Sequence, residues 1–135
     1  MDIVDLVGRV LFAFVFWQNG YRQLAQRKNM IAYAQSFGAP APAFSVPFTG
    51  VVMLLGGTML VLGIWPDVAA LALCAFLIAA AFIAHRYWEH EDFGMRAGQE
   101  AQFMKNIAMA GACLVFFAVY AQFDDELAHL VGPLF

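Results

Sequence analysis

Residues 48–84 read FTGVVMLLGGTMLVLGIWPDVAALALCAFLIAAAFIA, two apolar runs separated by the short break Trp65-Pro66-Asp67. A helix needs roughly 17 to 25 residues to cross a hydrocarbon core of about 30 Å, and each run approaches or reaches that length. Pro66 cannot continue the first helix, and Asp67 is placed to cap the second. The stretch therefore predicts a hairpin of two antiparallel membrane helices.

Two further apolar runs flank this hairpin, one from Ile3 to Trp17 and the other from Phe103 to Phe123. The composition is that of a membrane protein, because 63% of the residues are hydrophobic and 13% are charged, against about 25% charged in soluble domains. We predict an all-α fold, an integral membrane four-helix bundle that forms one domain over residues 1–135. The expected spans are about 3–20, 48–65, 67–88 and 103–123.

The connection over residues 21–47 is too long for a plain loop between two helices. Its apolar residues recur at helical spacing among basic and amide residues: Tyr21, Leu24, Ile31 and Ala34. This pattern predicts a short amphipathic helix at the membrane interface. Gly38 and the prolines at 40, 42 and 47 are expected to end it and to lead the chain back into the membrane.

Small residues within the apolar runs predict where helices approach one another closely. They are Gly50, Gly56, Gly57 and Gly63 in the second span, Ala75 and Ala79 in the third, and Ala108 and Ala112 in the fourth.

Six of the seven basic residues fall on one side of the predicted bundle: Arg22, Arg27, Lys28, Arg86, Arg96 and Lys105. Short loops rich in Lys and Arg face the cytoplasm, so loops 21–47 and 89–102 should be cytoplasmic and both termini outside. The acids Asp2, Asp5, Asp67, Asp124, Asp125 and Glu126 lie on the opposite side. The expected partner is the lipid bilayer, and nothing in the sequence supports nucleic-acid binding.

Arg9 lies about six residues inside the first span, where an arginine costs about 2.5 to 3.5 kcal/mol on insertion scales. Asp5, one turn earlier, offers an ion pair, and snorkelling to the headgroups is an alternative. Contact with a ligand such as a quinone is a third interpretation, and the sequence leaves all three open.

Four more polar side chains fall at a similar depth on the cytoplasmic side: Gln18, Asn19, His85 and Asn106. They could hydrogen-bond one another and hold the helices together, as polar residues in membrane bundles do. They could instead line a polar pocket, open to the cytoplasmic leaflet, in which His85 exchanges a proton with a quinone or another small ligand.

His85 and Glu89 are one helical turn apart and are weak candidates for metal ligands. The segment lacks the repeated His and Cys pattern of a strong site, and acids beside Arg86 explain it equally well. The sequence contains no haem, flavin, nicotinamide or iron–sulfur motif, so we expect no intrinsic cofactor and name no catalytic residue. A bound quinone is the remaining cofactor candidate.

Several short motifs, taken in order, resemble the DoxX family of small bacterial membrane proteins. They are Gly8-Arg9 with the aromatic run to Asn19-Gly20, Phe37-Gly38-Ala39-Pro40, Leu54-Leu55-Gly56-Gly57, Leu62-Gly63, Ala84-His85-Arg86-Tyr87-Trp88 and Phe103-Met104-Lys105-Asn106-Ile107-Ala108. Each motif is weak alone, and the ordered set runs along nearly the whole chain. Arg9, His85 and Asn106 fit the resemblance, whereas many relatives carry a glutamate where this chain has Met53.

The resemblance implies a four-helix bundle in the bacterial cytoplasmic (inner) membrane that acts as an oxidoreductase subunit or another component of a membrane redox system. Such a component would bind a quinone or dock a soluble oxidoreductase as its partner protein. The alternative is a noncatalytic membrane anchor or scaffold for a partner protein. Transport is the weakest interpretation, because few charges lie within the membrane and four helices form a pore only as a homo-oligomer.

Overall fold

A computed structural model describes residues 2–122 as a set of helices, and this part of the chain contains no β-sheet. The elements are α1 (Asp2–Ala25), α2 (Arg27–Ser36), α3 (Pro42–Leu62), α4 (Pro66–Ala84), the short 3-10 helix η1 (Tyr87–Glu89) and α5 (Phe93–Gln122). Four of them, α1, α3, α4 and α5, are long and apolar enough to cross a membrane. The predicted all-α four-helix membrane bundle is therefore confirmed. Phe123, Asp124, Asp125 and Glu126 lie outside the described residues.

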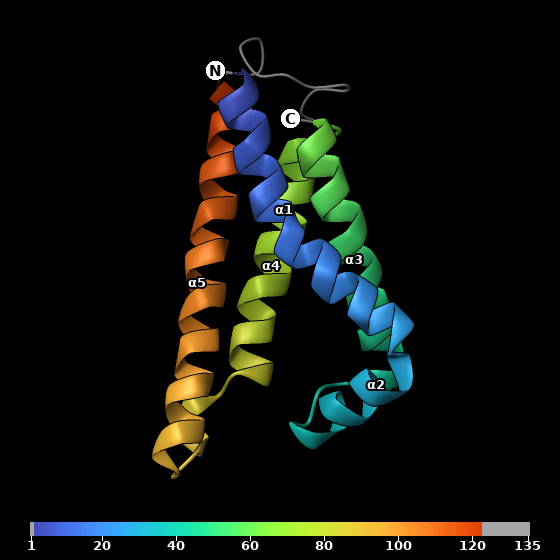
Figure 1. Cartoon of the computed structure of the whole chain (residues 1–135), viewed down its shortest axis with the longest axis vertical. Coiled ribbons are helices and arrows are strands. Elements are labelled where there is room, and N and C mark those ends of the chain that lie inside the picture. The colour runs from blue at the N-terminus through green and yellow to red at the C-terminus, as the bar shows by residue number, and fades with distance from the viewer. Residues whose placement is uncertain (1, 123–135) are drawn as a thin grey trace.

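The four long helices form two pairs, α1 with α3 and α4 with α5, and α3 also contacts α4 (Figure 1). α1 belongs to the first pair and crosses the bundle obliquely (Figure 1). Midway along α1 the ring of Phe12 lies 5.1 Å from that of Phe116 in α5, and nearer its end Gly20 meets Gly50 in α3. The start of α1 and the end of α5 lie together, and the two pairs diverge toward the opposite end, where α2 and η1 lie (Figure 1).

The predicted hairpin is the turn between α3 and α4. Gly63 ends α3 in the left-handed conformation (φ 65°), and its N–H donates to the carbonyl of Met59. Pro66 is the first residue of α4, where its missing N–H loses no hydrogen bond. Asp67 does not occupy the expected capping position, because the N-cap is Trp65. Asp67 lies instead within the first turn, fully buried, where the helix dipole favours a carboxylate.

The ends of the helices differ from the expected spans. α1 continues to Ala25, and α3 starts at Pro42 and contains Pro47, which was expected before the helix. The largest difference is in α5, which begins at Phe93, so most of the expected loop 89–102 is helical. The carboxylate of Asp92 starts this helix by accepting the N–H of Met95 at 3.0 Å. Its first turns are polar, and a search for apolar runs cannot detect them.

The short helix between the first two spans is confirmed as α2, but Tyr21 and Leu24, which were expected to belong to it, are part of α1. Ala34 is its buried residue, while Arg27 and Lys28 are exposed. Gly38 (φ 76°) and Ala41 (φ 42°) adopt left-handed conformations and turn the chain from α2 into α3. α2 therefore branches away from the pair α1–α3 at the end where the two helix pairs diverge (Figure 1).

Close helix contacts occur at glycines, as expected, but not at all of the residues that were proposed. A Cβ atom on Gly20 would lie 2.8 Å from the carbonyl oxygen of Gly50, and one on Gly56 would lie 2.9 Å from Leu73. Ala75, Ala79 and Ala108 are exposed, so their predicted role in packing is wrong. The contact between α4 and α5 is made by larger side chains, which include Leu73, Cys74, Leu77 and Cys113.

Replacing Gly20 with alanine is expected to destabilise the protein by about 1–3 kcal/mol, the usual range for overpacking. The reason is that the added methyl group meets the backbone of α3, which cannot move as a flexible side chain can. Chemical unfolding in mixed micelles measures the change. Gly111→Ala in α5 is the matched control, because its methyl group meets no atom within 4 Å. Equal stability of the two variants would contradict the close approach of α1 and α3.

Candidate functional site

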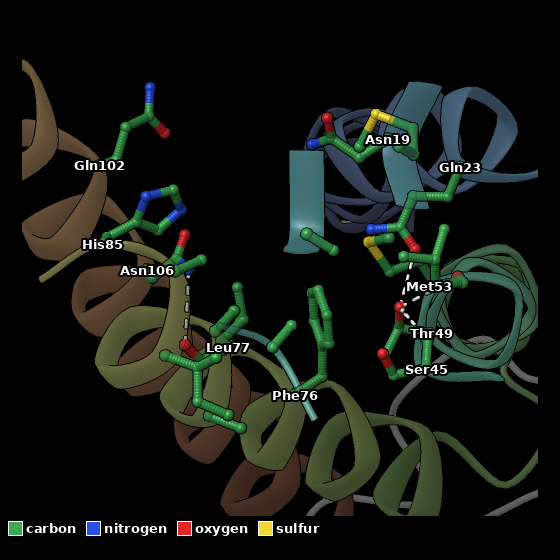
Figure 2. Close-up of a pocket in the computed structure, with 18 of the residues that line it drawn as sticks. Asn19, Gln23, Ser45, Thr49, Met53, Phe76, Leu77, His85, Gln102 and Asn106 are labelled. Carbon is green, nitrogen blue, oxygen red and sulfur yellow. Dashed lines mark hydrogen bonds between the residues drawn. The ribbon is translucent and has the colours of Figure 1, made fainter. Parts of the chain in front are cut away.

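A cavity of about 630 Å³ lies between the two helix pairs, at the end where they diverge. This volume is within the range of about 300–1,000 Å³ that is typical of small-molecule sites. All five α-helices contribute to its lining. In Figure 2 the side chains of α1 and α3 face those of α4 and α5 across an open space.

The wall formed by α1 and α3 is polar along one helix face. Gln18, Asn19, Arg22 and Gln23 project from the last turns of α1, where residues three and four apart share a face. The hydroxyl of Thr49 in α3 lies 2.7 Å from Oε1 of Gln23, and it shares its one proton between this hydrogen bond and one to the carbonyl oxygen of Ser45 at the same distance. This bond fixes the Gln23 amide against α3, and its nitrogen is turned toward the cavity (Figure 2).

The opposite wall is built by the end of α4 and the first half of α5. His85 follows the last residue of α4, and its Nδ1 lies 2.9 Å from Oε1 of Gln99. With Oε1 as the acceptor, Nδ1 carries the proton, and Nε2 keeps its lone pair. The ring points from this wall toward the cavity (Figure 2).

Asn106 is the most deeply placed polar residue of the cavity. Its side chain is 5% exposed, and its one hydrogen bond in the described part of the chain is a long one of 3.5 Å from Nδ2 to the carbonyl of Leu77. An amide can form up to four hydrogen bonds, and buried polar groups that lack partners are costly. The amide of Asn106 can therefore form further hydrogen bonds with a ligand in the cavity.

Four of the five predicted site residues line this one cavity: Gln18, Asn19, His85 and Asn106. Within residues 2–122 no hydrogen bond joins any two of them. The structure thus brings them together at one level around an open space, without the mutual hydrogen bonds that helix association alone would require. Their role toward a ligand stays a prediction.

Arg9 is not part of the cavity. It is 2% exposed and forms an ion pair with Asp5, and its guanidinium lies 5.1 Å from the centre of the Tyr120 ring in α5. Of the three interpretations of Arg9, the structure contains the ion pair, and the buried side chain does not snorkel. Arg9 joins the first half of α1 to α5 through Tyr120, whereas the cavity is lined by residues from the second half of α1.

The two weak metal candidates, His85 and Glu89, each contact a different protein group. Glu89 lies 3.4 Å from Arg86, whereas His85 bonds to Gln99. Within the described residues, no group of three or more His, Cys, Asp or Glu side chains is placed to hold a metal ion.

The sequence analysis missed three glutamines and the two cations of the cavity: Gln23, Gln99, Gln102, Arg22 and Lys105. The sequence does contain a pattern that indicates the glutamines at 99 and 102, because residues 99, 102 and 106 have the spacing of one helix face. The pattern was missed because residues 89–102 were expected to form a loop. Met53, where the resemblance to the family leads us to expect a glutamate, is 3% exposed and lines the cavity beside Thr49 (Figure 2).

α2 borders the cavity with Met30, Tyr33, Ala34 and Phe37. The guanidinium of Arg86, directly after His85, donates a hydrogen bond of 2.7 Å to the carbonyl of Phe37. This contact connects the end of α2 to the segment that follows α4 in the opposite helix pair.

Comparison with known proteins gives one result. The family model described as DoxX matches residues 4–86, which is more than half of the chain. The matched segment includes α1 to α4 and His85, and it stops before α5, so the proposed resemblance around Asn106 lies outside it. No curated protein and no solved structure gave a significant match.

Proposed function

The chain belongs to the DoxX family, and from this premise we propose that it binds a quinone in its cavity as a component of a membrane redox system. The observation that carries the proposal is Asn106, a buried amide with unused hydrogen bonds that projects into a cavity of suitable volume. Quinone carbonyls are hydrogen-bond acceptors on an apolar ring. Amide N–H groups beside apolar side chains are the complementary surface.

The lining has the two parts that such a molecule needs. Its inner part is apolar and includes Phe16, Met53, Phe76 and Leu77, while its amides and His85 lie toward the end where the pairs diverge. Figure 2 shows Phe76 and Gln102 on opposite sides of the space. In this arrangement Asn106 donates a hydrogen bond to a ring oxygen, and Nε2 of His85 accepts a hydrogen bond from a ring hydroxyl when the ligand is in its reduced, quinol form.

The chemistry of the bound quinone is two-electron, two-proton reduction. We propose that a docked soluble oxidoreductase exchanges the electrons, since the sequence carries no motif for an electron-carrying cofactor. The residues of this chain bind and orient the ring and exchange a proton at His85. The exposed face of α2 and the start of α5 lie at the same end as the cavity and are the proposed docking region (Figure 1).

We further propose that this end faces the bacterial cytoplasm and that both termini face outward. The basis is the distribution of basic residues, because Arg22, Arg27, Lys28, Arg86 and Arg96 all belong to or adjoin α2, η1 and the start of α5. A protease-protection assay with a tag at either terminus tests the orientation.

Replacing Asn106 with leucine is expected to weaken quinone binding about tenfold or more. A lost hydrogen bond and an unsatisfied carbonyl together amount to about 1–3 kcal/mol, and tenfold is about 1.4 kcal/mol. The measurement is titration of purified protein in detergent with a short-chain ubiquinone, together with mass spectrometry of small molecules and proteins that co-purify. Ile107→Ala is the matched control, because the neighbouring side chain is outside the cavity lining.

Unchanged ubiquinone binding in Asn106→Leu would contradict the proposed site. A stoichiometric partner protein together with no quinone, in the preparation and in the titration, would favour the alternative of a noncatalytic membrane anchor or scaffold. Circular dichroism of both variants checks that the helices are retained.

A further inference from the structure

The charged residues that line the cavity are all basic. Arg22 projects from α1 and Lys105 from α5, and no Asp or Glu belongs to the lining. Neither cation forms an ion pair within residues 2–122. The cavity therefore presents positive charge without an internal carboxylate to balance it.

The location of the cavity does not explain this one-sided charge. Acidic residues are present at the same end of the bundle, in η1, in the turn after it and in the first turns of α5: Glu89, Glu91, Asp92 and Glu100. Glu100 directly follows Gln99, which lines the cavity, yet Glu100 is exposed and outside the lining. The bias toward basic residues on the cytoplasmic side accounts for cations at this end but not for the exclusion of neighbouring acids.

Three glutamines of the lining have their amide oxygens directed at protein groups. The ammonium group of Lys105 donates to Oε1 of Gln102 at 2.7 Å, and because an ammonium cannot accept, this amide oxygen is committed. Oε1 of Gln23 contacts the hydroxyl of Thr49, and Oε1 of Gln99 pairs with His85. These three glutamine oxygens contact protein groups, so their N–H groups are the part of each amide that is left for a ligand. Asn106 differs, because its N–H donates to Leu77 and its oxygen stays an acceptor.

The geometry points to a ligand with an acidic head group and an apolar body, and we propose that the cavity binds such an anionic amphiphile. The head lies between Arg22 and Lys105, where amide donors surround it. The apolar body lies against Phe16, Met53 and Phe76. Charge-assisted hydrogen bonds are about twice as strong as neutral ones, so an anion gains more from these donors than a neutral ligand does.

This proposal shares its cavity with the proposed quinone site but does not depend on it. A carboxylate or phosphate head can come from a free fatty acid or from an anionic phospholipid of the surrounding leaflet. The chemistry is the same in both cases, and the experiment separates the two sources.

The test uses the full chain in nanodiscs of neutral phosphatidylcholine, titrated with laurate and with dodecanol, which have the same chain length and differ in the charged head. Laurate is expected to bind at least about fivefold more tightly, and the preference should decrease at high salt. In the double variant Arg22→Gln/Lys105→Gln the preference should fall to about one. Both side chains are exposed, so the double variant is expected to fold.

Arg27→Gln/Lys28→Gln removes the same number of charges from α2 outside the lining and should keep the preference. In a second arm, lipids that co-purify from a mixed membrane are compared between the wild type and the double variant. Loss of enriched phosphatidylglycerol identifies the leaflet as the source, and a laurate preference without lipid enrichment identifies free acids.

Equal binding of laurate and dodecanol would overturn the proposal, as would a preference that survives in Arg22→Gln/Lys105→Gln. Binding of ubiquinone is measured in the same preparations. Retained ubiquinone binding without a preference for laurate overturns this inference alone, whereas the quinone proposal fails on its own test at Asn106.

Discussion

Replacing Arg9 with leucine is expected to destabilise the protein by about 3 kcal/mol. Removing one partner of a buried ion pair costs about 3–5 kcal/mol, and the lower end applies because Asp5 keeps part of its exposure. The variant also loses the cation–π contact between Arg9 and Tyr120, which joins α1 to α5. Chemical unfolding in mixed micelles measures the free energy of unfolding.

Two comparisons make this prediction specific to the buried pair. Glu89→Gln breaks the exposed ion pair with Arg86 and should change stability by less than about 1 kcal/mol. Asp5→Asn combined with Arg9→Leu should be less destabilised than the sum of the single variants, because neither charge is then left alone. Strict additivity would show that the pair contributes nothing to stability.

The four membrane helices could be predicted from the sequence because each segment that crosses a bilayer must itself be apolar over its whole length. Apolar runs located the four spans, and Pro66 located the hairpin. The pairing of α1 with α3 was not accessible, since it depends on contacts such as Gly20 with Gly50 that only the assembled bundle defines. Helix ends were missed where the signal is not hydropathy, as at Asp92 and the polar first turns of α5.

The sequence could predict which polar residues lie at the same depth in the membrane, and this depth is one of the two properties that define the candidate site. Counting residues from the helix ends placed Asn19, His85 and Asn106 at one level, and the structure places them around one cavity. Residues at one depth hydrogen-bond to each other when their helices are close, and they surround a cavity when the helices diverge. The distance between helices depends on how they pack together, so the sequence of a single span does not reveal it. Arg9 was expected apart from this group, near the start of the first span, and its partners Asp5 and Tyr120 show that it connects α1 to α5 there.

Replacing Met53 with glutamate is expected to destabilise the protein by about 2–3 kcal/mol at pH 8. Met53 is 3% exposed within the apolar core, and a carboxylate at mid-membrane depth costs about 2.5–3.5 kcal/mol on insertion scales. The cavity beside it offers N–H donors such as that of Gln23, which lowers this penalty. Unfolding at pH 8 and pH 4 should show a smaller loss at pH 4, because protonation removes the charge.

Met53→Gln is the control for size and polarity without charge, and Met95→Glu, at an exposed position of α5, should change stability by at most about 0.5 kcal/mol. A loss in Met53→Glu no larger than that in Met53→Gln would contradict the expected cost of the charge.

The same substitution bears on what the cavity binds. A carboxylate at position 53 would supply the internal acceptor that the lining lacks, and it would face the wall that carries Asn106 and His85 (Figure 2). Met53→Glu is therefore expected to abolish the preference for laurate over dodecanol, whereas Met53→Gln should retain it. If the preference survives in Met53→Glu, the acidic head lies too far from Met53 to be affected by its replacement. If it is lost, a carboxylate at position 53 occupies the donors that otherwise bind the acidic head.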